Sequence, residues 1–372
     1  MLSNDGYGCE MEQVRTYQSS VLEPYDRGIE FGEYHRDEVA RTIAAYRRLF
    51  LARATGPFDV DTWAERAWQH IVGVAPTAAE EIRGIAEAAG VAVREIAALN
   101  ARTELLAIAN PTGVDECSTV VALPPGRPPV AVQTWDWYDA MSANWLHWTI
   151  PHPDGRVVET VTEYGVLGKI GVNGYGVGVM FNMLHHANDV TGELGFPVHL
   201  LSRQILDTAR DLDEALLAAK SVTTSASTSL TVVEGRPDGG RAVSIELFPG
   251  GPGLLEPEND ILVRTNHFVS ENGRSGCLAS TIGPGSEIRR AKILASFAER
   301  VPSTVAVVVD AMHDHDEVGG VCAHPDRTME PVLQHATLAT VAIDTVEHTL
   351  QVGVSGPCAR DAASTHARTA SQ

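Results

Sequence analysis

The stretch Asp115-Glu116-Cys117-Ser118-Thr119-Val120-Val121-Ala122-Leu123 marks the point at which the pattern of the chain changes. Before it, apolar residues recur at helical spacing; after it, short apolar runs are separated by Gly and Pro. A cysteine at the start of a strand is most often a small buried apolar residue. This one is followed by polar Ser and Thr and preceded by two acidic residues, which are rarely buried without partners. Cys117 is therefore a candidate nucleophile in an exposed turn before a strand.

A break between Glu116 and Cys117 would make the cysteine the first residue of a second chain. Such a residue combines a thiol with an α-amino group, whose free pKa near ~8 suits a general base at neutral pH. The thiol would attack the Glu116 carbonyl carbon and give a thioester by an N-to-S acyl shift, which water then opens. We therefore predict self-cleavage at this bond.

The chain divides at the cysteine into a helical part and a mixed part. Residues 1–22 are polar and lack periodicity, so we expect a flexible extension. Residues 23–116 form a helical segment, in which apolar residues fall at helical spacing over 37–51 and again in the segments that begin near 61, 77 and 93. Residues 117–359 would form the catalytic part of the same domain, and 360–372 are a small, polar tail that we expect to be disordered.

Short apolar runs rich in Val, Thr and Tyr predict strands after Cys117. A helical stretch covers 196–220, and Ser286 is expected to cap a further helix with Ile288, Ala291, Leu294 and Ala298 on its buried face. Strands and helices in clusters favour a layered α+β or α/β domain. The strands are expected at 118–123, 129–135, 145–150, 157–164, 229–233, 242–248, 261–268, 338–343 and 349–354, with a hairpin at 165–182.

Composition excludes several classes of protein. The net charge of -20 disfavours nucleic acid and anionic membranes as partners, because no basic field can neutralise phosphates. Five cysteines in 372 residues are odd in number and sparse, so a disulfide scaffold is not expected and a reducing compartment is. The N-terminal region lacks a signal-peptide pattern, and no apolar run is long enough to cross a bilayer. We expect a cytoplasmic protein.

Several motifs together resemble one known family. Asp-Glu-Cys-Ser-Thr at 115–119, followed after one strand by Gln-Thr-Trp-Asp-Trp at 133–137, is similar to the peptidase C45 family, typified by fungal acyl-coenzyme A:6-aminopenicillanic acid acyltransferase (isopenicillin N acyltransferase). The similar stretches extend in order along most of the chain. They include Arg27-Gly28, Gly32-Glu33, Asn100-Ala101-Arg102-Thr103-Glu104, Gly171-Val172-Asn173-Gly174, Arg264-Thr265-Asn266-His267-Phe268, Thr337-Leu338-Ala339 and Gly356-Pro357-Cys358.

The resemblance implies an N-terminal-nucleophile (Ntn) hydrolase, an α+β protein with an αββα four-layer sandwich of two antiparallel sheets between helical layers. It implies that Asp136 holds the Cys117 amine and thiol, and that Asn266 donates to the tetrahedral oxyanion. One such donor lowers the activation barrier by roughly 3 kcal/mol. The fungal enzyme has Gly before the nucleophile where this chain has Glu116, whose side chain we expect to affect the rate of cutting.

Other side chains near these motifs are expected to bind substrate, namely Trp135, Trp137, Arg102, Glu104 and His267. Trp135 and Trp137 could form an apolar wall for an acyl chain, although Trp in adjacent strands is more often core. Arg102 and Glu104 could form a charge pair beside the site, although a solvated helix face explains them as well. Asp136 could equally be a turn residue at a strand end, and Asn266 an Asn that ends a strand by bonding its own backbone.

Two alternatives concern histidines. His267, beside Asn266, could pair with Cys117 as a papain-like base, and that mechanism needs no cut. A second group of residues looks like a metal cluster but lacks Cys-x-x-Cys or His-Glu-x-x-His spacing, so we expect no metal. The resemblance gives a metal-free account, since the family often carries Asp-His and Cys-x-His in this region. The group comprises His313, Asp314, His315, Asp316, Cys322 and His324.

The sequence therefore predicts a self-processing enzyme in which Cys117 takes an acyl group from a small amide or acyl donor through an acyl-thioester. Water as the second substrate gives an amidohydrolase, and an amine gives an N-acyltransferase. No cofactor is expected, with acyl-CoA possible as a substrate, and the mature protein would be an α/β heterodimer from one precursor. The alternatives are an uncleaved cysteine hydrolase using Cys117, His267 and Asn266, and a non-catalytic binding protein with the same fold.

Overall fold

The computed structural model describes residues 13–112, 117–189 and 193–359. Its N-terminal part is helical, as the periodicity predicts, and none of the described helices has the length and apolar character needed to cross a membrane. The helices of this part are α1 (Pro24–Tyr34), α2 (Arg36–Arg53), α3 (Val60–Val74), α4 (Pro76–Ala89), α5 (Val93–Asn100) and α6 (Arg102–Ala109).

Two sheets follow. The eight-stranded sheet has the order β1-β4-β5-β6-β7-β8-β9-β10, and the five-stranded sheet has the order β11-β2-β3-β12-β13. The first consists of β1 (Thr16–Gln18), β4 (Trp145–Pro151), β5 (Val157–Glu163), β6 (Ile170–Asn173), β7 (Val177–Met183), β8 (Thr228–Arg236), β9 (Gly239–Leu247) and β10 (Gly253–Leu255). The second consists of β2 (Ser118–Ala122), β3 (Val130–Tyr138), β11 (Ile261–Arg264), β12 (His335–Asp344) and β13 (Thr349–Val354).

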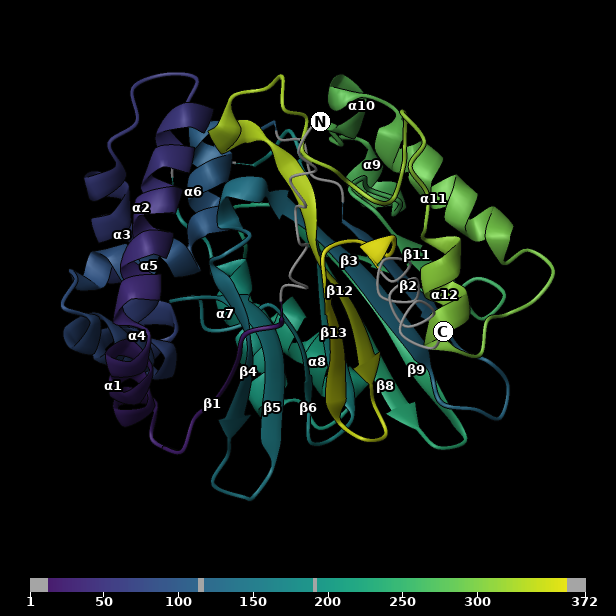
Figure 1. The fold of residues 1–372 in the computed structure, drawn as a ribbon, viewed down its shortest axis with the longest axis horizontal. Helices are drawn as coiled ribbons and strands as arrows, with labels where there is room; N and C mark the ends of the chain where they lie inside the picture. The colour runs from purple at the N-terminus through teal and green to yellow at the C-terminus, as the bar shows by residue number, and fades with distance from the viewer. Residues whose placement is uncertain (1–12, 113–116, 190–192, 360–372) are drawn as a thin grey trace, which may run out of the picture.

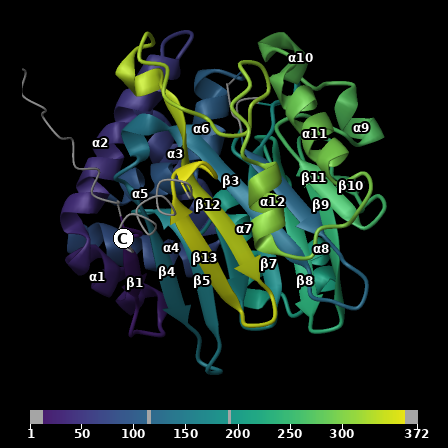
Figure 2. The same cartoon turned by 45° about the vertical axis from the view of Figure 1, so that its right-hand side comes forward.

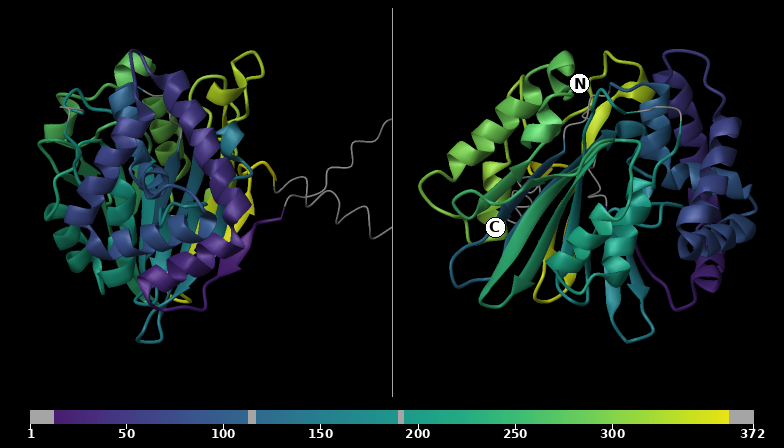
Figure 3. Two further views of the ribbon diagram at one scale, coloured as in Figure 1. Left: turned by 90° about the vertical axis from the view of Figure 1, so that its left-hand side faces the viewer. Right: turned by 180° about the vertical axis from the view of Figure 1, so that it is seen from behind.

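Helices cover the outer face of each sheet. Helices α7 (Val198–Thr208) and α8 (Leu212–Lys220) pack on the eight-stranded sheet and are seen from behind in Figure 3. Helices α11 (Gly285–Ser296) and α12 (Val305–Ala311) pack on the five-stranded sheet, as Figure 2 shows. The predicted αββα sandwich is therefore confirmed. The remaining short helices are α9 (Glu271–Arg274), α10 (Ala279–Ile282), η1 (Asp139–Met141) and η2 (Pro331–Leu333).

Strand β3 shows how one strand serves both cores. Val130 and Val132 belong to the apolar cluster under α11 and α12, whereas Ala131, Trp135 and Trp137 belong to the larger core that includes the space between the sheets. Side chains alternate across a strand, so a strand inside a four-layer sandwich is buried on both faces. All nine residues of β3 are buried, and its polar residues, Gln133, Thr134 and Asp136, therefore lie inside the protein.

Helices α1 to α6 form a block beside the sandwich (Figures 1 and 3). Helices α1 and α4 approach closely because Gly28 and Gly84 face each other; a Cβ on Gly28 would lie 2.3 Å from the carbonyl oxygen of Glu81. The neighbouring Arg27 donates to Glu81 with both Nε and Nη2. The contact thus explains the Arg-Gly pair at 27–28 in physical terms.

Two expectations about the ends of the fold need correction. The extension predicted over 1–22 is not wholly irregular: residues 16–18 form β1, which pairs with β4, and Ser19 accepts a hydrogen bond from the Trp148 indole at 2.9 Å. The β1–β4 pair is parallel, so the eight-stranded sheet is not purely antiparallel. An edge strand of three residues carries too little apolar periodicity to be recognised. Residues 1–12 and the predicted tail at 360–372 lie outside the described residues.

Candidate active site

Cys117 directly precedes β2, between β11 and β3. Strand β2 pairs Thr119 with Arg264 of β11 and Ser118 with Thr134 of β3. Continuing these antiparallel registers places Cys117 opposite Asn266 on one side and Trp135 on the other. The cysteine is 5% exposed, and its Sγ donates to the backbone oxygen of Asp136 at 3.4 Å. The five-stranded sheet therefore brings Cys117, Asp136 and Asn266 together at one end.

Asn266 is fixed by hydrogen bonds that decide how its amide points. Arg289 donates from Nη2 to Oδ1 of Asn266 at 2.9 Å, and Nδ2 of Asn266 donates to the backbone oxygen of Met183 at 3.0 Å. Arginine is only a donor, so Oδ1 must face it. The Nδ2 group of Asn266 thereby faces the backbone of Met183, a residue that lines the cavity against Cys117.

The helix that supplies Arg289 differs from its prediction. The N-cap of α11 is Pro284, and the Ser286 hydroxyl accepts from the Asn266 backbone N–H at 2.8 Å instead of capping the helix. The buried side chains of α11 are Arg289 and Ile293. Of the predicted face, Leu294 packs against the apolar cluster under the helix, whereas Ala291 and Ala298 are exposed. Arg289 lies inside because Oδ1 of Asn266 accepts a hydrogen bond from it.

The backbone of the nucleophile is held from the opposite sheet. Asn182 of β7 donates from Nδ2 to the Cys117 carbonyl oxygen at 3.1 Å and accepts from the Thr119 hydroxyl at 2.8 Å. Both residues are fully buried. Because these bonds cross between the sheets, Cys117 keeps its position after any cut on its N-terminal side.

A small cavity of about 10 Å³ lies against the cysteine, enough for roughly one water molecule. It is lined by Trp135, Trp137, Phe181, Met183, Arg102 and Lys169. The structure thus places both predicted tryptophans beside the nucleophile. Trp145 instead packs edge-on against Trp135, with ring centroids 6.0 Å apart, and is part of the core.

Buried charges form the polar side of this cavity. Glu163 pairs with Arg102 at 3.1 Å and with Lys169 at 3.7 Å, and it accepts from the Tyr46 hydroxyl. Burial pushes the pKa of Glu163 up, but the two cations outweigh burial and hold this pKa below its ordinary value. Lys169 lies 3.5 Å from the centroid of the Trp135 ring. The site therefore combines an apolar wall with a fixed positive field.

Glu104 does not make the predicted pair with Arg102. Its Oε1 accepts from the Val198 backbone N–H at 2.9 Å, and its Oε2 has no hydrogen-bond partner among the described residues. Arg102 is turned toward Glu163. Burial raises the pKa of Glu104 to about 7, so about half of these carboxyl groups are protonated at pH 7 in the folded protein.

We expect Glu104→Gln to stabilise the protein at alkaline pH. The folded pKa of about 7 exceeds the ordinary value of 4.5, so the folded state binds the proton more tightly and wild-type stability falls as pH rises between these values. Glutamine mimics the neutral acid and removes this loss, which amounts to at most ~3 kcal/mol. Urea unfolding should show equal stability at pH 4 and a more stable variant at pH 8. A variant that is weaker at pH 8 would show that the carboxylate is needed in its charged form.

His267 does not approach Cys117 in the way that a papain-like base would. Its Nδ1 hydrogen-bonds to the hydroxyls of Ser286 at 2.8 Å and Thr265 at 3.1 Å, and no contact with Cys117 is present among the described residues. Burial, together with nearby arginines of which Arg264 is the strongest, lowers the pKa of His267 to about 3. Such an imidazole does not form the imidazolium that a thiolate–imidazolium pair requires. The geometry disfavours the uncut alternative.

Comparison with known proteins agrees with the resemblance seen in the sequence. Residues 125–357 match the family described as acyl-coenzyme A:6-aminopenicillanic acid acyl-transferase. This chain belongs to that family. The 40 kDa form of the acyl-coenzyme A:6-aminopenicillanic-acid-acyltransferase of Emericella nidulans is 39% identical over 129 residues, which are 34% of this chain and 35% of that protein. The match thus spans about a third of this acyltransferase relative.

Two solved structures are similar to this member of the acyltransferase family. A Caenorhabditis elegans N-acylethanolamine-hydrolyzing acid amidase ortholog has a TM-score of 0.40 and 14% identity, covering 62% of this chain and 93% of the other. Penicillin V acylase from Agrobacterium tumefaciens has a TM-score of 0.42 and 14% identity, covering 63% of this chain and 82% of the other.

Sequence reasoning missed Asn182, Lys169, Glu163 and Arg289 in this acyltransferase-family site. Two of them carried a detectable signal: Asn182 is the one polar residue among the side chains of the apolar run 177–183, and Lys169 is the one charge in 164–172. A polar group inside a fully buried segment requires a partner, so each of these two residues indicates a buried polar contact. Arg289 carried no such signal, because arginine on a helix is ordinarily solvent-facing.

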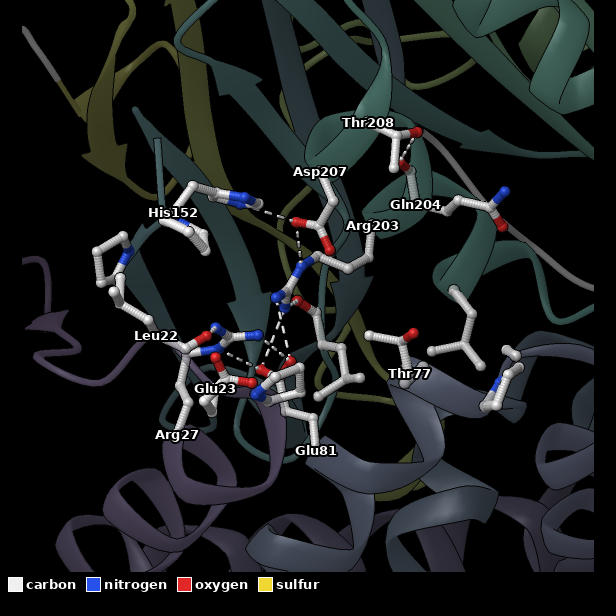
Figure 4. Close-up of a pocket in the computed structure, with 18 of the residues that line it drawn as sticks. Leu22, Glu23, Arg27, Thr77, Glu81, His152, Arg203, Gln204, Asp207 and Thr208 are labelled. Atoms are coloured by element: carbon white, nitrogen blue, oxygen red, sulfur yellow. Dashed lines mark hydrogen bonds and ion pairs between the residues drawn. The ribbon is translucent and has the colours of Figure 1, made fainter. Parts of the chain in front are cut away.

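A larger cavity of about 520 Å³ lies away from Cys117, between α1, α4 and α7 (Figure 4). Its wall carries a buried charge network in which Glu81 receives hydrogen bonds from Arg27 and Arg203, and Arg203 also pairs with Asp207 at 2.7 Å. His152 lies 3.2 Å from the same Asp207. In Figure 4 these groups point toward one another. The network joins the helical block to the sandwich.

Proposed function

We propose that this chain cuts itself between Glu116 and Cys117 and then uses Cys117 as an N-terminal nucleophile in acyl transfer. The observation that supports this most directly is the placement of Cys117 between Asp136 and Asn266 at one end of the five-stranded sheet. Glu116 itself lies outside the described residues. The α-amine released by the cut would act as the base for its own thiol.

In maturation, Sγ of Cys117 attacks the Glu116 carbonyl carbon, and the peptide nitrogen leaves with a proton. Water then opens the thioester, which restores the thiol and leaves a free amine on Cys117 and a carboxylate on Glu116. In turnover, the amine takes the thiol proton as sulfur attacks the donor carbonyl. Asn266 Nδ2 donates to the oxyanion, and the leaving group departs with the proton.

Membership of the acyltransferase family supports an acyl-coenzyme A or a small amide as donor. The side chains that line the small cavity at Cys117 include Trp135, Trp137, Phe181 and Met183 for an apolar acyl group, and Lys169 and Arg102 as cations for a polar or anionic group. At about 10 Å³ this cavity has to widen before an acyl group can enter. No cofactor is needed for this chemistry. The cytoplasmic location and the absence of nucleic-acid or membrane partners stay predictions.

The second substrate can be identified from how the acyl group divides between the free acid and an amide product. The enzyme is incubated with an acyl-coenzyme A or a fluorogenic N-acyl amide, with and without a primary amine, and the products are separated by mass spectrometry. An N-acyltransferase gives a new amide at the expense of the free acid as amine rises. A hydrolase gives only free acid at every amine concentration. If the chain is cut but forms neither product with any substrate of the panel, the binding-protein alternative is favoured.

The two fragments should stay together as an α/β heterodimer. Pairs across the cut include Arg102 with Glu163 at 3.1 Å, Tyr46 with Glu163, and Arg203 with Glu81 at 3.1 Å, all from buried side chains. Separating such groups would leave uncompensated buried charges. Fragments 1–116 and 117–372 are therefore expected to elute together in gel filtration and to separate only in denaturant.

Replacing Asn266 by alanine should lower kcat by about 10²–10³, because one oxyanion donor is lost. The Ser286 bond uses the backbone of residue 266 and is kept, but buried Arg289 loses the Asn266 acceptor, so urea unfolding must show that the variant is folded under the assay conditions. A matched variant, Asn188→Ala, removes an exposed side chain that bonds the Pro249 carbonyl and should leave kcat unchanged. Steady-state kinetics on cleaved protein distinguish the two. Equal kcat for Asn266→Ala and wild type would refute the oxyanion role.

A further inference from the structure

Two imidazoles and two thiols gather near the end of β13. The ligating atoms of His315, His324 and Cys358 all lie within 4.8 Å of one another. Nε2 of His324 is 3.6 Å from Sγ of Cys358, and the rings of His315 and His324 stack with centroids 5.1 Å apart. The Cys322 thiol, 6% exposed, donates to the Met312 backbone oxygen at 3.6 Å, and Cys358 is near enough to affect its pKa. Both cysteines are free thiols.

The backbone holds the loop that carries three of these side chains. The N–H groups of Val321 and Cys322 both donate to the carbonyl oxygen of Asp314, at 3.0 and 2.9 Å. Lys292 of α11 pairs with the Asp314 carboxylate at 3.0 Å. The fourth side chain arrives with the segment after β13, where the Ser355 N–H donates to Leu338. The four groups are therefore set by closed turns and a strand end.

We propose that His315, His324, Cys358 and Cys322 form a site for a divalent zinc-type cation. Two thiolates and two imidazoles are a typical tetrahedral zinc set. Zinc–sulfur and zinc–nitrogen bond lengths require neighbouring ligand atoms roughly 3.4–3.8 Å apart, so atoms that lie up to 4.8 Å apart need to approach by at most about 1.4 Å. Cys322 is not one of the three residues whose ligand atoms lie within 4.8 Å, but it is a neighbour of Cys358, so we assign it the fourth ligand position.

This proposal departs from the sequence-based expectation of no metal. A spacing rule does not detect such a set, because Cys358 lies 34 residues after His324 and no short motif contains both. The turn from Cys322 to His324 supplies Cys-x-His, and tertiary structure adds the distant thiol. This inference does not depend on the proposed acyl transfer.

A bound cation would stiffen the strand beside the active site. Ala323, between two of the ligands, donates to the Thr337 hydroxyl and accepts from the Thr337 N–H, both at 2.9 Å. Thr337 is paired with Asp136 across β12 and β3, next to a β-bulge. The cation would therefore position the strand that backs Asp136 without touching substrate.

The test measures metal on the full chain. Wild type is purified without chelator, incubated with zinc, desalted and analysed by plasma mass spectrometry; we expect about one equivalent, released when a mercurial blocks the thiols. Cobalt substitution should give the intense visible bands of a tetrahedral ion and a thiolate-to-cobalt charge-transfer band. His324→Ala and Cys358→Ser should each lower zinc affinity by more than about tenfold.

Cys277→Ser is the matched control, because Cys277 is a free thiol that contacts Phe268 outside the cluster. It should keep the metal and the cobalt spectrum. The proposal is overturned if wild type takes up no zinc or cobalt, if His324→Ala and Cys358→Ser bind it as wild type does, or if peptide mapping of protein purified under reducing conditions finds a Cys322–Cys358 disulfide.

Discussion

Cys117→Ala is expected to remain a single chain of 372 residues and to show no acyl transfer. The substitution removes the sulfur that would attack Glu116 in maturation and the donor carbonyl in turnover, so both reactions are lost together. Intact mass spectrometry measures the first, and product formation from an acyl-coenzyme A or N-acyl amide measures the second. Wild type should yield masses for 1–116 and 117–372.

The matched control is Cys277→Ser, a thiol replacement away from the site, which should cut and turn over as wild type does. A second protein tests whether the α-amine of Cys117 acts as the base. A chain that begins at Cys117, coexpressed with residues 1–116, should be active without cutting. Activity in an uncut wild-type protein would favour the uncleaved mechanism. Activity that survives in Cys117→Ala would remove Cys117 from the chemistry altogether.

Glu81→Gln is expected to destabilise the fold by about 3–5 kcal/mol, the usual effect of removing one partner from a buried ion pair. Glu81 is 2% exposed and receives hydrogen bonds from two buried arginines, Arg27 and Arg203. Neutralising it leaves Arg203 with Asp207 as a carboxylate partner, whereas Arg27 keeps its hydrogen bond to the Leu22 backbone oxygen (Figure 4). Urea unfolding of the Cys117→Ala background, in which the chain stays whole, measures the loss.

The neighbouring residue supplies a control. Glu80 pairs with Arg83 at 2.9 Å, but both side chains are 47% exposed, so Glu80→Gln should cost less than about 1 kcal/mol. The two substitutions make the same chemical change one residue apart on α4. Equal unfolding midpoints for both variants would show that the buried network contributes no stability.

Local pattern alone located much of the sandwich. The strand runs after Cys117 and the helices before it were predicted from periodicity, because burial of one face or two imposes that periodicity directly on the sequence. One error arose where a charge is buried: the predicted face of α11 contained only apolar residues and so left out Arg289, which is buried against Asn266. The strand predicted at 261–268 ends at Arg264 in the structure. Asn266 and His267 belong to the loop that follows, and the apolar Phe268 after them made the predicted strand too long.

The sequence by itself determined that a cysteine lies at the boundary between a helical segment and a strand-rich segment. It also placed Asp136 and Asn266 in motifs of one family. Only the tertiary structure decided what surrounds it: the amide of Asn266 aimed by Arg289, the carboxylate of Glu163 between two cations, and two thiols beside two imidazoles. The reason is physical. Periodicity records which side chains are buried, whereas the partner of a buried polar group is chosen by how distant segments pack, and no local spacing encodes that choice.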